Sequence, residues 1–308
     1  MAHIAFVTGY PRSGTTMLAT MLARHANICT MGETHFFLST NFRPLRKHTH
    51  TWWNHFINHN RRFQIIDFRL PDNGSAELLN AAQYFSRYAD AYCQTKNADW
   101  FIEKSPTHVD VLPSIRKAYP DAPIIHIVRD VRDTTASMLN ASWAHNSPLK
   151  HISEWKAALR RVKRYSAKPG MNILHVRYED LLTNPEAELT RILKHIDPTL
   201  AYSDSLLSDT TSTDAIPEYE KAWKQKAGEK PDASRIFAWK TTPEAWHNLA
   251  ALANSELGEW GYELQPTERS VDTGQKIGLT DKLKAKIYTN ALYRNFRVYV
   301  KSRTLYDL

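Results

Sequence analysis

The sequence predicts a three-layer α/β fold, a P-loop-like fold in which a central parallel sheet is flanked by helices. Four apolar segments, at 4–8, 100–103, 123–128 and 172–177, are typical of buried strands. Segments with helical periodicity separate them, among them 75–96 and 109–119, where we expect helices. Alternating strands and helices form parallel sheets through right-handed crossovers, and such sheets bind ligands at the carboxyl ends of their strands. We therefore expect the functional residues to follow these strands.

The composition is ordinary for a globular chain that buries one sizeable core, with 42% hydrophobic and 23% charged residues among 308. No run of about eighteen apolar residues occurs, so we expect no membrane span. The first predicted strand follows Met1 directly, so we expect no secretory signal. Two cysteines, Cys29 and Cys93, fit buried residues in a reducing compartment better than a disulfide scaffold. These features predict a cytoplasmic location.

The chain is basic, with a formal net charge of +8 and an isoelectric point near 9.3, which favours an anionic partner. No stretch interleaves regular basic residues with aromatic ones, and no zinc-finger spacing occurs. We therefore expect a small anion rather than nucleic acid. A basic surface that is merely solvated is the alternative.

The segment from Phe6 to Leu18 has the most specific local pattern. Gly9 and Gly14 bracket a turn of four residues after the first strand, and helical spacing begins at Thr15. A helix that starts at such a turn presents unpaired N–H groups and the positive end of its dipole, which bind phosphate or sulfate. We prefer anion binding to the alternative of an ordinary turn with a hydroxyl-rich helix start. The turn adds one cation and three hydroxyl groups, from Arg12, Ser13, Thr15 and Thr16.

The spacing of the two glycines also matches the beginning of a Walker loop, which continues with a lysine and then Ser or Thr. Thr15 stands where that lysine belongs, and the cation, Arg12, lies two residues before Gly14. The sequence therefore predicts a phosphate-binding loop that lacks the lysine of an ATPase.

Two further candidates, Glu33 and His35, follow a short segment at 27–31 that is compatible with a strand. We expect the end of this strand to lie beside the end of the first strand, where open sheets bind ligands. Two structural alternatives remain. Glu33 is compatible with a solvated loop carboxylate, and His35 with a partly buried ring beside Phe36 and Phe37.

Lys104 and Arg129 stand at the carboxyl ends of two other predicted strands. Lys104 is either a surface cation or an anion ligand in the cleft. Ser137 follows Arg129 by eight residues, about two helical turns, so both can touch one phosphate if the helix runs beside the site. Pairing of Arg129 with Asp133 is the alternative.

Two regions lie outside this framework. Residues 40–75 concentrate His, Trp and Arg, and His55 and His59 have a spacing that can bind metal. No cysteine or carboxylate falls within 48–63, so we expect no metal site and favour the lining of an acceptor pocket or a plainly packed helix. Residues 203–235 are polar and aperiodic, as in a long loop or lid. We divide the chain into a domain at 1–265 and a helical extension at 266–308.

The strand-end residues resemble the motifs of sulfotransferases that use 3′-phosphoadenosine 5′-phosphosulfate (PAPS). Tyr10–Thr16 resembles the loop for the 5′-phosphosulfate, and Ile127–Arg129 with Ser137 resembles the 3′-phosphate motif. Glu103–Pro106 is similar to a segment of the carbohydrate and tyrosylprotein branches. Two more segments, Arg177–Leu181 and Trp239–Lys240, match recurrent family segments. The resemblance covers about residues 1–263 and is closest to the tyrosylprotein, carbohydrate and bacterial branches.

The resemblance assigns the donor-binding residues. Arg129 and Ser137 are expected at the 3′-phosphate, with Tyr178 near the adenine and Lys240 near the 3′-phosphate. Some relatives have an arginine four residues after the serine, where this chain has Ala141, so its hold on the 3′-phosphate is expected to differ. The 5′-phosphosulfate is expected to be held by Arg12, Ser13, Gly14, Thr15 and Thr16.

The resemblance also assigns the catalytic residues. Glu33 matches the base of the tyrosylprotein branch and some bacterial branches, and His35 is its rival because an imidazole titrates near neutral pH. Lys104 matches a lysine that contacts the transferring group. Together with Arg12 and the helix N-terminus, it supplies positive charge for a loose, in-line transition state.

The implied activity is transfer of a sulfuryl group from PAPS to an acceptor hydroxyl, with PAP as the leaving group and no metal required. The acceptor is open among small molecules, glycans and peptides, and the oligomeric state is open as well. Two other functions are compatible with the residues. One is a nucleotide kinase or other P-loop NTPase, which Thr15 disfavours, and the other is a non-enzymatic module that binds polyanions.

Overall fold

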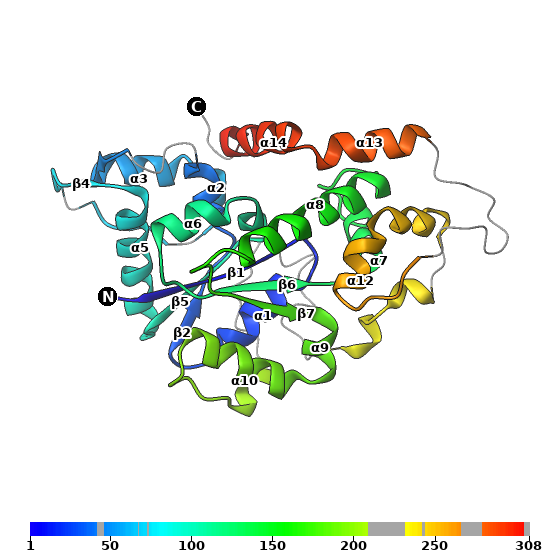
Figure 1. The fold of residues 1–308 in the computed structure, drawn as a ribbon. Coiled ribbons are helices and arrows are strands. Elements are labelled where there is room, and N and C mark those ends of the chain that lie inside the picture. The colour runs from blue at the N-terminus through cyan, green and yellow to red at the C-terminus, as the bar shows by residue number, and fades with distance from the viewer. Residues whose placement is uncertain are drawn as a thin grey trace.

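In a computed structural model, five parallel strands form the central sheet (Figure 1). The structure describes residues 1–41, 46–66, 68–72, 74–208, 232–241, 244–265 and 279–304. The sheet confirms the predicted fold class and the four predicted strands. Its strands lie in the order β2 (Ile28–Thr30), β5 (Trp100–Lys104), β1 (His3–Gly9), β6 (Ile124–Val128) and β7 (Ile173–Arg177).

The central position of β1 places the phosphate-binding loop in the middle of the sheet. Strand β1 pairs with β5 on one side and with β6 on the other, each in parallel. Its residues Ala5, Phe6 and Val7 are fully buried, as expected of a strand covered on both faces. The expected neighbourhood of the first two strands was wrong, because β5 lies between β1 and β2. Lys104, at the end of β5, is therefore nearer to the loop than any residue of β2.

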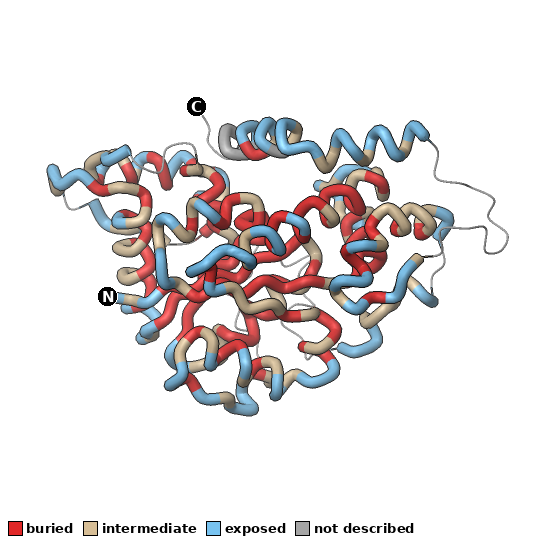
Figure 2. The backbone as a smooth tube through the Cα atoms, viewed as in Figure 1, coloured by how far each residue is buried: buried red, intermediate tan, exposed pale blue. Residues whose placement is uncertain are grey.

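Helices cover both faces of the sheet, and each face has its own apolar core. Figure 2 shows that buried residues concentrate in the sheet and the inner faces of the helices. One core contains α1 (Thr15–Leu22), α9 (Tyr178–Thr183) and α10 (Pro185–Ile196). The other contains α2 (Phe36–Thr40), α3 (His50–Asn58), α5 (Ala81–Lys96), α6 (Leu112–Ala118), α7 (Val131–Leu139) and α8 (Pro148–Ser166).

Several helices begin or break differently from the periodicity. The helix expected from residue 75 begins at Ala81, because Leu78 and Leu79 form β4, which pairs with β3 (His48–Thr49), and Asn80 caps the helix with Gln83. The helix expected over 109–119 is preceded by the 3₁₀ turn η1 (Pro106–Asp110). The remaining elements are α4 (Arg61–Ile65), η2 (Asp204–Leu207), η5 (Ala233–Arg235), η6 (Ala238–Lys240), η7 (Ala245–Ala253), α12 (Asn254–Glu259), α13 (Leu279–Thr289) and α14 (Ala291–Thr304).

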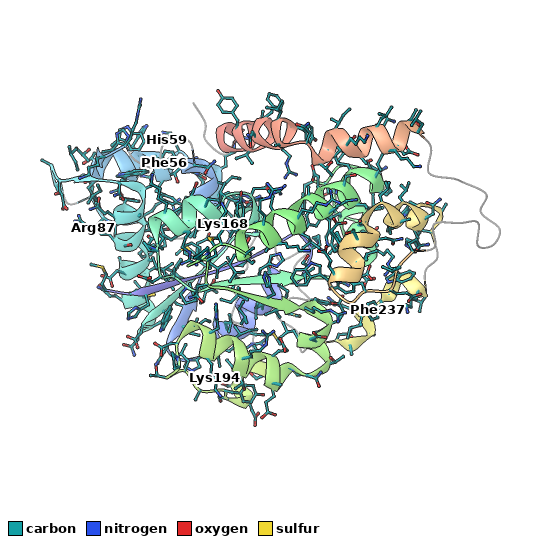
Figure 3. All side chains as sticks on the ribbon, in the orientation of Figure 1. Phe56, His59, Arg87, Lys168, Lys194 and Phe237 are labelled. Carbon is teal, nitrogen blue, oxygen red and sulfur yellow. The ribbon has the colours of Figure 1, made fainter. Side chains whose placement is uncertain are left out.

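The aromatic segment at 48–63 packs into the main core. Trp53 is 1% exposed and stacks on Tyr84 of α5, and its indole nitrogen donates to the Leu79 carbonyl at 2.8 Å. Figure 3 labels Phe56, which is buried and packs against Trp53, and His59, which is exposed and whose ring centroid lies 3.9 Å from that of His55. Among the described residues, no group of three or more His, Cys, Asp or Glu side chains is arranged to hold a metal ion. A role for this segment beside an acceptor remains a prediction.

The sequence predicted a lid at 203–235 and a helical extension at 266–308. Most of the expected lid, residues 209–231, lies outside the described residues. The expected helical extension contains two helices, α13 and α14, which follow one another along the outside of the domain, with α13 against α8 and α14 against α2 (Figure 1). No described helix has the length and apolarity needed to cross a membrane.

Candidate active site

The loop between β1 and α1 is shaped by two glycines, at each of which a side chain would collide with its surroundings. A Cβ at Gly9 would lie 2.4 Å from the Ile127 carbonyl oxygen, and one at Gly14 would lie 2.5 Å from the Tyr178 ring. Gly14 also has a φ of 98°, in the left-handed region. The loop is therefore pressed against β6 and α9, with the first turn of α1 directly behind it.

The start of α1 has the properties of an anion site. Gly14 stands at the N-cap, so no side chain caps the helix, and its first N–H groups are available to a ligand. The hydroxyl of Ser13 is fully buried in the loop and has no hydrogen-bond partner among the described residues. An unpaired buried hydroxyl is costly unless a ligand or water satisfies it. The loop thus fits the phosphate-binding role predicted from its glycines.

Beside the loop, two arginines, a serine and a tyrosine form a group that we call the donor-side cluster. The Arg12 Nε donates to Ser137 Oγ on α7 at 2.9 Å. The Arg129 guanidinium lies over the Tyr178 ring at 4.3 Å and donates to the Arg235 carbonyl at 3.0 Å. The structure therefore brings Arg12, Arg129, Ser137 and Tyr178 together around Gly14. Arg12 and Ser137, expected at opposite ends of the donor, are in direct contact.

The alternative pairing of Arg129 with Asp133 is also present, at 3.7 Å. Burial raises the pKa of Asp133, and the charge of Arg129 opposes this shift. The second Asp133 oxygen accepts from the Trp239 backbone N–H at 3.0 Å, which holds the 238–240 turn against α7. Lys240, on this turn, pairs with Glu263 at 2.6 Å rather than with the donor-side cluster in the described contacts.

On the other side of β1, Lys104 links the loop to the two candidate bases. Its Nζ donates to Thr16 Oγ1 at 3.3 Å and to Glu33 Oε1 at 3.1 Å, and its side chain has no exposed surface. The other Glu33 oxygen lies 3.1 Å from His35 Nε2, and His35 Nδ1 lies 2.7 Å from Thr107 Oγ1. We call Glu33, His35, Lys104 and Thr107 the base-side cluster.

Burial determines the protonation state of His35. Burial, and then the charge of Arg62, lower the pKa of His35 to about 4, although Glu33 opposes the shift. His35 is therefore neutral near pH 7. A carboxylate only accepts hydrogen bonds, so with Glu33 ionised the proton of His35 is on Nε2, and Nδ1 accepts from Thr107. The Glu33 side chain is 11% exposed, against 6% for His35.

Glu103, a buried carboxylate of β5, holds the turn that contains Glu33 in place. The sequence did not predict this role. Glu103 accepts from Thr34 Oγ1 at 2.6 Å and from Ser105 Oγ at 2.7 Å, and it lies 2.8 Å from His108. The same Ser105 oxygen accepts from the His35 backbone N–H at 3.0 Å. Burial would raise the pKa of Glu103, but His108 and the hydroxyl donors outweigh it and lower the pKa. The signal in the sequence was a carboxylate inside an apolar strand.

Comparison with solved structures supports the fold. The sulfotransferase domain from the curacin biosynthetic pathway superposes with a TM-score of 0.60, covering 86% of this chain and 99% of that chain at 16% identity. At that level of identity the likeness concerns the fold alone.

Sequence comparisons identify the family. A putative protein-tyrosine sulfotransferase of Caenorhabditis briggsae is 26% identical over 210 residues, which cover 67% of this chain and 68% of that protein. The nodulation protein NoeE of Sinorhizobium fredii is 24% identical over 323 residues, which cover 92% of this chain and 70% of that protein. A model of the sulfotransferase family matches residues 5–202, well over half of the chain. The protein therefore belongs to the sulfotransferase family.

Proposed function

We propose that this protein transfers a sulfuryl group from PAPS to an acceptor hydroxyl, with Glu33 as the general base. The observation that carries the proposal is the position of Lys104, whose ammonium group contacts both Thr16 of the phosphate-binding loop and the Glu33 carboxylate. A cation between an anion site and a base suits a reaction in which negative charge moves between them.

The residues of the loop and the donor-side cluster fit such a donor. The uncapped start of α1 and the unpaired Ser13 hydroxyl suit the 5′-phosphosulfate. The two arginines, Arg12 and Arg129, and the Ser137 hydroxyl suit a second phosphate nearby. A second phosphate on the ribose is the feature that separates PAP from ADP.

PAPS supplies the sulfuryl group, and its PAP portion is the leaving group. The protein's own residues do the rest. Glu33 accepts the proton of the acceptor hydroxyl as the new oxygen–sulfur bond forms and the bond from sulfur to the phosphate oxygen breaks. Lys104 stabilises the charge that develops beside Thr16, while neutral His35 donates to Glu33 and fixes the direction of its carboxylate.

Glu33 is preferred to His35 for two physical reasons. Both ring nitrogens of His35 are occupied, because Nε2 donates to Glu33 and Nδ1 accepts from Thr107, so neither has a lone pair free for an acceptor proton. Glu33 also has the larger exposed fraction, so an acceptor can reach it more easily. His35 then acts through Glu33 as a positioning residue.

The acceptor class is left open between a peptide tyrosine and other hydroxyls. Several relatives bear the name protein-tyrosine sulfotransferase, whereas NoeE is named as a nodulation protein. The first test is therefore transfer of labelled sulfate from PAPS to a panel that includes a tyrosine peptide, a phenol, an oligosaccharide and a lipid alcohol.

A thermal-shift series separates the proposal from its alternatives before the acceptor is known. We expect PAP to raise the melting temperature at concentrations where ADP and ATP with Mg²⁺ do not, because only PAP fits both ends of the site. Stabilisation by ATP with Mg²⁺, together with hydrolysis, would instead favour a P-loop NTPase. Indifference to PAP with steeply salt-dependent binding of polyanions would favour the binding module.

A further inference from the structure

The two C-terminal helices present an apolar surface to solvent. Leu279, Leu283 and Ile287 of α13 are spaced four residues apart, as are Leu292 and Phe296 of α14, so each set lies on one helix face. These five side chains are between 51% and 79% exposed. We call this surface the C-terminal stripe. Runs of exposed large apolar side chains of this kind mark interaction sites.

The stripe is not the surface by which the helices attach to the domain. Arg297, on another face of α14, pairs with Asp110 at 2.9 Å and with Glu154 at 2.7 Å, and the next residue, Val298, is 4% exposed in the core. Helix α13 lies against α8 (Figure 1). The attached faces therefore point inward, and the stripe points outward.

The same two helices contain most of the excess charge of the chain. Residues 279–304 include seven basic residues and one acidic residue, whereas the net charge of the whole chain is +8. Lys282, Lys284 and Lys286 are exposed and alternate along α13 with apolar positions. The basic character that predicted an anionic partner is thus concentrated beside the C-terminal stripe.

We propose that α13 and α14 dock onto a membrane surface that contains anionic lipid. Helices that bind a membrane surface combine an exposed apolar face with flanking Lys and Arg. The apolar face inserts at the boundary of the acyl chains, and the basic side chains bind the anionic headgroups. A soluble polyanion would satisfy the lysines but leave the stripe in water. A second copy of the chain would cover the stripe but would bring two basic surfaces together. An anionic membrane matches both features.

Vesicle co-sedimentation of the full chain tests the charged part of the proposal. We expect binding to phosphatidylcholine vesicles with about one-third phosphatidylglycerol, little binding to pure phosphatidylcholine, and release in about 0.5 M salt. Changing Lys282, Lys284 and Lys286 to Gln should weaken binding at least tenfold, since each basic residue near such a surface contributes roughly a fivefold factor.

The matched control removes the same charge elsewhere. Lys96, Lys168 and Lys194 are exposed on other parts of the chain, and Figure 3 shows Lys194 on α10, on the side opposite α13 and α14. The triple change of these lysines to Gln should alter vesicle binding less than about twofold. Equal losses in the two triple variants would overturn the proposal, because attraction would then depend on total charge.

A second pair of variants tests the apolar part. Leu283→Gln with Phe296→Gln should abolish most vesicle binding and leave the melting temperature unchanged, because both side chains are exposed. Leu78→Gln with Trp143→Gln, two other exposed apolar residues, should bind like the native chain. Light scattering without vesicles measures whether the chain instead forms a dimer through the C-terminal stripe. A dimer that the Leu283 and Phe296 changes dissociate, with no vesicle binding by the native chain, would contradict the membrane proposal.

Discussion

The base-side and donor-side clusters lie on opposite sides of β1 and hold their charges in different ways. In the base-side cluster, Glu33 is fixed by protein groups at both oxygens, with Lys104 on one and His35 on the other. In the donor-side cluster, Arg129 rests on an aromatic ring and a backbone carbonyl, and its carboxylate partner is 3.7 Å away. If Glu33 is the base and Arg129 binds the donor, as we propose, the protein aligns the base through its own side chains and leaves the guanidinium of Arg129 without a close carboxylate.

The largest effect that this comparison predicts is at Lys104, which joins the two clusters. Lys104→Met should reduce transfer by roughly 10²- to 10³-fold, as expected when a preorganised charge at the reacting group is lost. It should also destabilise the fold by about 3 kcal/mol, because Glu33 loses its cation in a largely buried place. Steady-state kinetics and urea unfolding measure the two effects. Lys194→Gln, an exposed change, serves as the control, and a fully active Lys104→Met enzyme would remove Lys104 from the mechanism.

The donor side is tested by the loss of one cation. Arg129→Met should weaken PAP binding by roughly 10- to 100-fold, the range for charged hydrogen bonds, and leave the binding of adenosine 5′-phosphate nearly unchanged. Isothermal titration with the two nucleotides gives the ratio directly. Equal weakening of both nucleotides would mean that Arg129 does not distinguish a 3′-phosphate.

The sheet and the ends of its strands were predictable from the sequence, because apolar strands and glycine-bracketed turns have local patterns. Contacts between distant segments had no such pattern. The position of β5 between β1 and β2 brings Lys104 to Thr16, and periodicity gives no strand order. Arg12 was expected at the 5′ end of the donor, and only the fold reveals its contact with Ser137, 125 residues away.

Buried side chains were the hardest to interpret. The support of the Glu33 turn by Glu103 depends on Thr34 and Ser105 converging from two elements, which the sequence does not reveal. Cys29 and Cys93 were expected as buried residues, and both are buried. Their sulfurs lie within contact distance across β2 and α5. The predicted start of α5 was wrong because residues 78–79 pair with β3 and do not form the first helical turn.

A smaller effect is expected at Glu103, which holds the turn containing Glu33 through its hydrogen bond from Thr34. Glu103→Gln should lower kcat by about tenfold and leave the affinity for PAP unchanged, because a slightly displaced base loses alignment without altering the donor side. A merely structural role would lower the melting temperature without this split between kcat and donor binding. Glu186→Gln, on an exposed turn of α10, is the matched control.

A further prediction concerns the dependence of stability on pH. His35 binds a proton at about pH 4 in the folded protein but at 6.5 when exposed, so the unfolded chain binds more protons between these values. The contribution of His35 to the free energy of unfolding is fully present above pH 6.5. It decreases by about 3 kcal/mol as the pH falls from 6.5 to 4. His35→Gln should therefore flatten the decline in unfolding free energy between pH 7 and pH 5. His55→Gln, an exposed histidine, should keep the native decline.

Single-turnover transfer by Glu33→Gln at saturating PAPS tests the central claim most directly. We expect a rate at least 10²-fold below that of the native chain, the range for loss of a general base, and a dissociation constant for PAP within about twofold of the native value. His35→Gln should retain a larger share of the rate, because His35 acts through Glu33. A Glu33→Gln enzyme with native single-turnover rates would contradict the assignment of the base.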